Sequence, residues 1–400
     1  MKRVALVVTI LFALLAFGIG FVGTTVTLDI TRPITDNSNA TVRFVVNDGD
    51  TTTDVANNLE KAGLIRNALV FRLFARYKHL DTSIQHGIYD LSPGMTMDQI
   101  VTKLQMAIPD ERLITVPPGM RVTQYPKYFS DLPSFNADNF MKIAQTGILL
   151  DDAKTPLSTK YWFVPKKGTD VKYALEGYLF PDTYYFDKTD DETKVIETML
   201  DNLGEHLCPG PNNQPDAYLA DKDQCKAYAV KVGDTDIFSA MKKAYSTKDD
   251  TDALHTALTF ASLTVREIKD PNDAPGVTNV YYTRYMALLG KTPNTGLVGN
   301  LGSDPTTQYA RDSEAPPKDG KWWTPLTQAA TTIATKDPYN TYVTDTIPPG
   351  PIAAPLWADI VAAVNPSISK YFYFIQDCHG KTLYATTKDQ HDANASKPCS

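Results

Sequence analysis

The sequence is poor in the residues that build metal and cofactor sites. It contains four cysteines and six scattered histidines in 400 residues, with no Cys-x-x-Cys pair and no His/Cys cluster. It also lacks a Ser-His-Asp arrangement, a Walker loop and a dinucleotide fingerprint. We therefore expect no metal, no bound cofactor and no serine-hydrolase chemistry.

The sequence also lacks a block of basic residues. Lys and Arg number 39 against 46 Asp and Glu, which gives a formal net charge of −7 and makes nucleic acid an unexpected partner. There are no solenoid repeats and no low-complexity tail. With 42% hydrophobic and 21% charged residues, the chain has the composition of an ordinary globular protein, and its length suits two or three domains.

The N-terminus carries the one long apolar run. Lys2 and Arg3 precede uncharged residues 4–22, which as a helix would rise roughly 28 Å, close to the thickness of a bilayer core. A cleaved signal peptide is the alternative, but the run is long and no Ala-x-Ala site follows it. We expect a transmembrane anchor, with residues 1–3 in the cytoplasm and the remainder outside it. The polar residues 23–40 are expected to form a tether.

The cysteines agree with an oxidising compartment. All four follow the apolar run, where disulfides can form. The pairing of Cys208 with Cys225 and of Cys378 with Cys399 is the most local of the three possible pairings.

Residues 41–108 have the pattern of a small α+β unit. The alternating "TVRFVV" predicts a strand, and Thr52 or Thr53 can cap a following helix that ends at Gly63. A second helix, a strand at "GIYDL" and a third helix opening at Thr96 are expected next. The unit has few clustered acids, so we expect it to bind or to act as a spacer.

Residues 109–400 have the pattern of a larger α+β domain. Its elements include a strand at "RLITV", a long helix over 251–270, and a later helix and strand at "WADIVAAVNP" and "KYFYFIQD". Between them, "PYNTYVTDTIPPGPIAAP" is expected to be an ordered loop with polyproline character. Two surface insertions are expected, near 205–228 and 311–335.

The segment "LEGYLFPDTY" places Glu176 among bulky apolar and aromatic residues. If the segment is extended as far as Phe180, these neighbours would raise the pKa of Glu176, as a general acid working near neutral pH requires. The alternative is a core strand whose single polar member reaches water.

Hydrolysis of a glycosidic bond usually needs a second carboxylate. Asp182 follows Pro181 and suits a turn or an Asx cap. Glu267 follows Arg266 and could form a surface pair with it. Asp304 precedes a proline, a common structural position for aspartate. None of these acids is marked as the partner of Glu176 by spacing alone.

Several segments nevertheless follow one another in the order of a known family. "LEGYLFPDTY" is followed by "FASLTVRE", "GSDPTTQY", "YNTYVTDTIPPGPIAAP", "AAVNP" and "YFYF". The first resembles the signature of the MltG (YceG-like) family of membrane-anchored endolytic murein transglycosylases. The next three are similar to that family's A-S-I-V-E-K-E helix, Q-S-D-P-T-V-x-Y loop and Y-N-T-Y run. The N-terminal unit resembles its LysM-like subdomain.

The resemblance implies a reaction and a site. Such enzymes cleave the bond between N-acetylmuramic acid and N-acetylglucosamine without water, leaving a 1,6-anhydro ring. One glutamic acid serves as acid and then as base, and the signature places it at Glu176. The implied partners are nascent peptidoglycan strands, the membrane and the synthases that extend the glycan. The cleft candidates are Tyr178, Asp182, Glu267, Asp304, Gln308, Asn340 and Tyr342.

Some positions depart from the family pattern. Val265 replaces the first Glu of the helix motif, Gly302 replaces the Gln before S-D-P-T, and Thr346-Ile347 replaces Gly-Leu. These departures leave two rival hypotheses: a cell-wall binding or scaffold protein that has lost the chemistry, and a hydrolase that uses two carboxylates.

Overall fold

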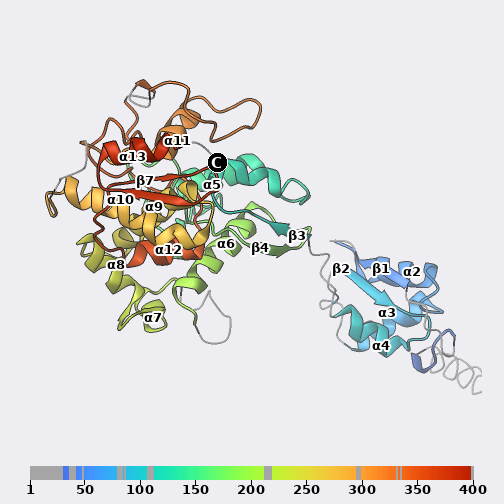
Figure 1. The fold of residues 1–400 in the computed structure, drawn as a ribbon. Coiled ribbons are helices and arrows are strands. Elements are labelled where there is room, and N and C mark those ends of the chain that lie inside the picture. Colours follow the sequence, from blue (N-terminus) through green and yellow to red (C-terminus); the bar gives the residue numbers. More distant parts are fainter. Residues whose placement is uncertain are drawn as a thin grey trace, which may run out of the picture. The chain divides into compact units, whose positions relative to one another are not determined.

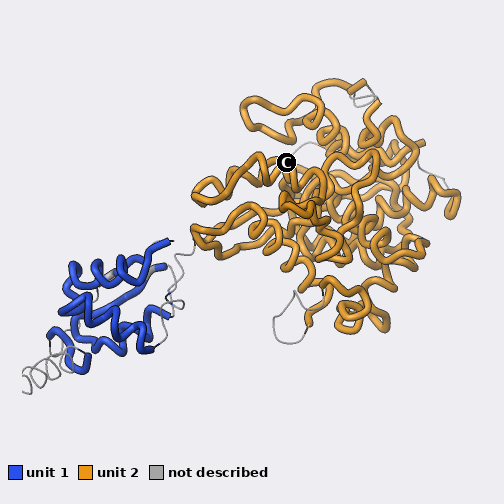
Figure 2. The backbone as a smooth tube through the Cα atoms, turned by 180° about the vertical axis from the view of Figure 1, so that it is seen from behind, with its two compact units in different colours: residues 1–111 blue, residues 112–400 orange. Residues whose placement is uncertain are grey.

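The chain forms two compact units, residues 1–111 and residues 112–400, which are described separately (Figure 2). The computed structural model describes residues 30–35, 42–46, 49–78, 84, 87–105, 112–210, 219–293, 299–329, 332–333 and 336–397.

The predicted membrane helix at 4–22 lies outside these residues, as do the cytoplasmic stub and most of the tether. No helix in the described part of the chain is long and apolar enough to cross a membrane. Residues 30–35, which lie within the expected tether, are hydrogen-bonded to later residues of the first unit. Arg66 donates to the Arg32 carbonyl over 2.7 Å, and the Ile34 and Thr35 amides donate to the Pro93 carbonyl.

The described residues of the first unit form a two-stranded antiparallel sheet with three helices, and the predicted order of these elements is confirmed. Thr96 caps the third helix as expected. The predicted cap at Thr52 or Thr53 is wrong, because the extended Thr51 caps the first helix in a reciprocal box with Asp54. Its elements are β1 (Val42–Val46), α2 (Thr52–Lys61), α3 (Ala68–Tyr77), β2 (Gly87–Leu91) and α4 (Met97–Leu104).

The second unit is mostly helical, with short two-stranded sheets (Figure 1). The antiparallel pairs are β3 with β4, β5 with β6 and β7 with β8. Its elements are β3 (Arg112–Thr115), η1 (Val122–Tyr128), α5 (Ala137–Thr146), η2 (Leu157–Thr159), β4 (Thr183–Phe186), α6 (Glu192–Leu207), α7 (Lys222–Ala227), β5 (Lys231–Val232), β6 (Thr235–Asp236), α8 (Ile237–Tyr245), α9 (Asp250–Glu267), η5 (Pro271–Asp273), α10 (Ala274–Leu288), α11 (Asp304–Glu314), α12 (Trp357–Val364), β7 (Tyr373–Gln376), β8 (Thr382–Ala385) and α13 (Lys388–Ala395).

Helix α9 is the centre of this unit. It packs against α8, α10, α11 and α12, and consecutive residues from Ala257 to Thr264 are buried, which is typical of a helix enclosed on all sides. Asp249 caps its start by accepting from the amides of Thr251 and Asp252. The helix ends at Glu267, shortly before Pro271, so the core helix carries an acid at its last turn.

The segment around Glu176 is a turn, so it has neither the extended conformation considered as far as Phe180 nor the core strand of the alternative. The Tyr178 amide donates to the Leu175 carbonyl, and Gly177 has φ +80°, a conformation that glycine adopts at little cost. A Cβ at Gly177 would collide with the ring of Pro351, so the turn packs tightly against the proline-rich loop. The strand β4 begins only at Thr183.

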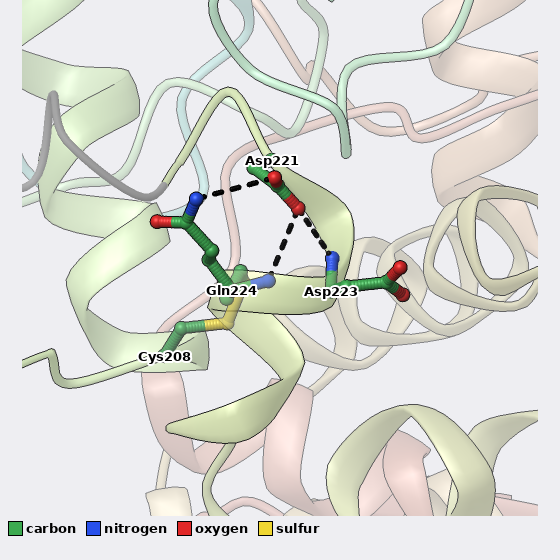
Figure 3. The surroundings of a disulfide bond; sticks show 5 residues. Cys208, Asp221, Asp223 and Gln224 are labelled. Carbon is green, nitrogen blue, oxygen red and sulfur yellow. Dashed lines mark hydrogen bonds between the residues drawn. A yellow bond between two sulfur atoms is a disulfide. The ribbon is translucent and has the colours of Figure 1, made fainter.

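The predicted disulfide between Cys208 and Cys225 is confirmed (Figure 3). It joins the end of α6 to α7. Asp221 caps α7 by accepting from the backbone amides of Asp223 and Gln224. The second predicted pair includes Cys399, which lies outside the described residues.

The segment predicted as an insertion from 311 begins inside a helix, because α11 continues to Glu314. The loop that follows carries Trp322 and Trp323, which lie over the buried guanidinium of Arg121, 4.6 and 5.6 Å from the ring centroids. The Trp323 amide donates to Asp312 over 3.0 Å. This part of the loop is therefore anchored to the core of the unit.

Candidate active site

A cavity of about 790 Å³ opens where α9 ends and α11 begins. This volume lies toward the upper end of the range for ligand sites. Segments far apart in the sequence form its walls. The lining residues are Glu267, Tyr281, Arg284, Asn300, Gly302, Asp304, Tyr342, Tyr373, Phe374, Ile375, Gln376, Lys388 and His391.

Glu267 lies on the wall of this cavity and has the environment of a general acid. Its side chain is half-buried. Tyr281 donates to its Oε1 over 2.6 Å and Ser303 over 3.4 Å. Burial raises the pKa of Glu267, and the charge of Asp304 adds to this effect, while the hydrogen bond from Tyr281 opposes it. Its position in the last turn of α9 also disfavours a negative charge. The carboxyl group can therefore hold a proton and still face the cavity.

Asp304 is a second acid in the cavity. It lies at the N-terminus of α11, whereas Glu267 lies at the C-terminus of α9. It is exposed and occupies the first position of α11, where the helix dipole favours a negative charge. Tyr342 donates to its Oδ1 over 2.7 Å. The cavity therefore contains two acids, of which Glu267 is half-buried and Asp304 is exposed.

Arg284 lines the cavity and brings a positive charge to it. Its Nε donates to the Phe372 carbonyl over 2.6 Å, and its Nη1 donates to the Leu301 carbonyl over 2.5 Å. These bonds fix the β7 strand and the segment before α11 to α10. The buried guanidinium partly offsets the rise in the pKa of Glu267.

Glu176 does not line this cavity and is closed off from solvent. Its side chain is 1% exposed. Oε1 accepts from the Val122 amide over 2.9 Å, and Oε2 accepts from the Tyr309 hydroxyl over 3.0 Å. Burial raises its pKa to about 8, against the opposing effects of Arg121 and these two hydrogen bonds. Both oxygens are therefore engaged in joining η1 and α11 to the turn that carries the acid.

The remaining predicted residues divide between the cavity and the scaffold. Tyr178 is buried and bonded to Nδ1 of His255 over 3.0 Å. Asp182 is exposed and accepts from the Thr183 amide. Asn340 is buried, where it accepts from Thr307 over 3.0 Å. Gln308 is half-buried on α11. Of the predicted set, the cavity brings together Glu267, Asp304 and Tyr342.

Sequence reasoning missed most of the residues that line the cavity. Tyr281 and Arg284 come from α10 and are three residues apart, on one face of that helix. The arginine within the aromatic run "VYYTRYMAL" was a signal that could have marked this face. The residues contributed by β7 and α13 gave no comparable signal.

The fold and the cavity define a class: a two-unit α+β protein whose larger unit holds a cavity with a half-buried acid at the end of its central helix. The chain belongs to the YceG-like family, whose model matches residues 44–397.

Relatives with assigned names cover most of the chain. The chain is 26% identical to the endolytic murein transglycosylase of Streptococcus pneumoniae serotype 2. The match covers 97% of this chain and 64% of that protein. It is 27% identical to the endolytic murein transglycosylase of Bacillus subtilis, over 90% of this chain and 86% of that one. A crystal structure of a putative yceG-like protein from Listeria monocytogenes is 23% identical, with a TM-score of 0.49, covering 89% of this chain and 99% of that one.

Proposed function

We propose that the protein is a membrane-anchored lytic transglycosylase that cuts peptidoglycan strands within the chain. The observation that carries this proposal is the carboxyl group of Glu267, which is half-buried, has a raised pKa and lines a cavity of about 790 Å³. The relatives named endolytic murein transglycosylase support the choice of substrate.

We propose Glu267 as the acid in place of Glu176. A general acid must come within hydrogen-bonding distance of the glycosidic oxygen. Glu267 lines a cavity, whereas Glu176 is 1% exposed and has both oxygens occupied by protein donors. Glu267 is also the residue that matches the second Glu of the family's helix motif. Glu176 as the acid stays the alternative prediction.

The proposed reaction needs only one carboxyl group. Protonated Glu267 gives its proton to the oxygen that links muramic acid C1 to glucosamine C4, and the C1–O bond breaks. The resulting carboxylate takes the proton from the muramic C6 hydroxyl as that oxygen bonds to C1. The nucleophile belongs to the substrate and is present at high effective concentration. Tyr281 holds the carboxyl group in position through its 2.6 Å hydrogen bond.

The departures from the family pattern leave this acid in place. Val265 is half-buried and packs against the hydrophobic core, so the lost Glu is replaced by a core contact. Gly302 does line the cavity, with φ +60°. Its lack of a side chain widens the site beside Asp304, and this is where substrate preference is expected to differ from the family pattern.

A two-carboxylate hydrolase is the second candidate, favoured by the presence of Asp304 beside Glu267 in the cavity. The two reactions differ in the ends that they create. Mass spectrometry of products from uncrosslinked peptidoglycan in H₂¹⁸O tests this directly. We expect 1,6-anhydro-muramic ends without ¹⁸O. Reducing ends that carry ¹⁸O, lost in Asp304→Asn, would establish the hydrolase, and unchanged glycan would favour a scaffold protein.

The remainder of the proposal concerns location. We propose that residues 4–22 anchor the chain with its N-terminus in the cytoplasm, and that both units work outside the membrane. The first unit, by its LysM-like resemblance, would bind glycan near the membrane, where synthases extend it. Protease accessibility of the two units in intact and permeabilised cells tests this orientation: protection in intact cells followed by digestion only after the inner membrane is opened would contradict it.

A further inference from the structure

Helix α3 of the first unit exposes an apolar stripe. Leu69, Leu73 and Tyr77 recur at every fourth residue and therefore lie on one face of the helix. Their exposed fractions are 55%, 59% and 78%. The opposite face packs into the core of the unit, where Phe71 and Ala75 are buried. Single exposed apolar residues are common on proteins, but a stripe along a whole helix indicates a binding surface.

The other two helices of this unit have no such stripe. The side chains that they expose are all polar, as on an ordinary solvent-facing helix. These residues are Thr53, Asp54, Asn57, Asn58, Glu60 and Lys61 on α2, and Asp98, Gln99, Thr102 and Lys103 on α4.

The stripe lies in a basic part of the sequence. Residues 61–80 contain five Lys and Arg and no Asp or Glu, whereas the whole chain has a net charge of −7. Arg66 is three residues before Leu69, and Arg76 is three residues after Leu73, so both arginines flank the stripe on its own face. Both are exposed. An apolar stripe flanked by cations is typical of a helix that lies on an anionic membrane surface.

Acids from α2 and α4 also contact this helix. Asp98 pairs with Lys78 over 2.8 Å in an exposed contact, so this pair is neutral as a whole. Glu60 accepts from the first amide of α3 over 3.4 Å. Arg66 and Arg76 therefore leave the exposed face with an excess of positive charge.

The chain also enters the first unit beside this helix. The guanidinium of Arg66 donates to the carbonyls of Arg32 and Pro33, next to the residue that caps α3. Residues 23–29 alone separate the proposed anchor from the first residue that the structure describes. Fully extended, these residues span roughly 25 Å. The proposed anchor would therefore hold the start of α3 close to the bilayer.

We infer that the exposed face of α3 binds the surface of an anionic membrane. Leu69, Leu73 and Tyr77 would lie at the boundary between headgroups and acyl chains, as the apolar face of an interfacial helix does, and Arg66 and Arg76 would lie at the lipid phosphates. A tether alone lets the unit rotate, whereas this contact fixes which side faces the membrane. The inference goes beyond the cleavage reaction and rests on the proposed anchor.

The test uses the full chain reconstituted in lipid nanodiscs. In Leu73→Trp the new indole reports on the stripe, and its signal is the difference from wild type, because both proteins share the four native tryptophans. We expect lipids brominated near the glycerol to quench this difference in anionic nanodiscs, and to quench it less in zwitterionic ones. Adding Arg76→Gln should lower the ratio of membrane-bound to free stripe about fivefold, the effect of one cation near an anionic surface.

Val45→Trp is the matched control. Val45 is an apolar residue of the same unit and is 48% exposed. Phe44 and Val46 pack into the core with the helices, so Val45 faces the other side of the sheet and should not be quenched. Quenching of Leu73→Trp that does not exceed this control would overturn the inference. Blue-shifted emission without quenching would contradict it as well, because a protein would then cover the stripe.

Failure of the anchor gives a different result. A full chain that does not co-purify with nanodiscs would refute the anchor at 4–22, and flotation with anionic vesicles then decides the inference. Loss of flotation in the double variant Leu69→Ser, Leu73→Ser would support it, and flotation equal to wild type, or none in wild type, would overturn it. Glycan cleavage enters neither measurement, so the proposed reaction is tested separately.

Discussion

Glu176 is a buried acid whose ionisation should oppose folding, and this can be measured. Its folded pKa of about 8 compares with an ordinary value of 4.5. Because the folded pKa is the higher one, the stability linked to this group is fully present below pH 4.5 and is lost as the pH rises through 8. The difference corresponds to ~5 kcal/mol overall, of which about 3 to 4 kcal/mol falls between pH 5 and pH 8.

Glu176→Gln replaces the titrating carboxyl group by an amide that does not titrate and has nearly the same shape. The free energy of unfolding of the variant, relative to wild type, should therefore rise by about 3 to 4 kcal/mol between pH 5 and pH 8. At pH 5 the variant can be the less stable one, because an amide has one acceptor oxygen where the carboxyl group uses two, for Val122 and Tyr309.

Urea denaturation followed by tryptophan fluorescence gives this quantity. All four tryptophans lie between residues 162 and 357, so the signal reports on the second unit alone. Other titrating groups are shared by both proteins and cancel in the difference. A difference that stays constant from pH 5 to pH 8 would refute the reasoning, since it would mean that Glu176 remains ionised beside Arg121.

Three further predictions follow from single contacts. Gly177→Ala should destabilise the second unit by roughly 2 to 5 kcal/mol, because the positive φ and the overlap with Pro351 both oppose a side chain; an unchanged urea midpoint would contradict this. Tyr281→Phe removes a hydrogen bond that lowers the pKa of the proposed acid, so the alkaline limb of the pH–activity profile should move to higher pH, and a move to lower pH would contradict the assignment. Replacing Cys208 and Cys225 by serine opens a loop with a sequence separation of 17. The free energy of unfolding should fall by about 3 kcal/mol, and an unchanged melting temperature would contradict this.

Local signals in the sequence predicted the elements well. Helix caps such as Thr96 depend on a few neighbouring residues, and the hydrophobic period of α9 is visible without any tertiary information. The turn at Glu176 was not foreseen, because its aromatic residues favour strands and only extended conformations were considered. Its conformation is instead set by Gly177 and by the distant Pro351.

The ranking of the acids could not be predicted from neighbours in the chain. Glu176 stands out in the sequence because its neighbours are aromatic, but the fold closes solvent off from it. Glu267 follows Arg266 and was interpreted as a possible surface pair. On a helix, adjacent side chains point in different directions. Arg266 donates to the Gly119 carbonyl and stacks on Trp323, while Glu267 faces Tyr281 and the cavity.

The wall formed by β7 and α13 was beyond sequence reasoning for a related reason. Lys388 and His391 are more than a hundred residues from Glu267 in the chain, and their helix is polar, with no buried residue. Only the packing of α13 on the hairpin brings them to the cavity.

The central claim is that Glu267 is the acid of a lytic transglycosylase, and two matched variants test it. Glu267→Gln and Glu176→Gln are each incubated with uncrosslinked peptidoglycan beside wild type, and 1,6-anhydro-muramic ends are counted by mass spectrometry. Circular dichroism confirms that both variants are folded. We expect Glu267→Gln to form no anhydro ends and Glu176→Gln to retain turnover. Loss of these ends in a folded Glu176→Gln protein, with turnover retained in Glu267→Gln, would contradict the account.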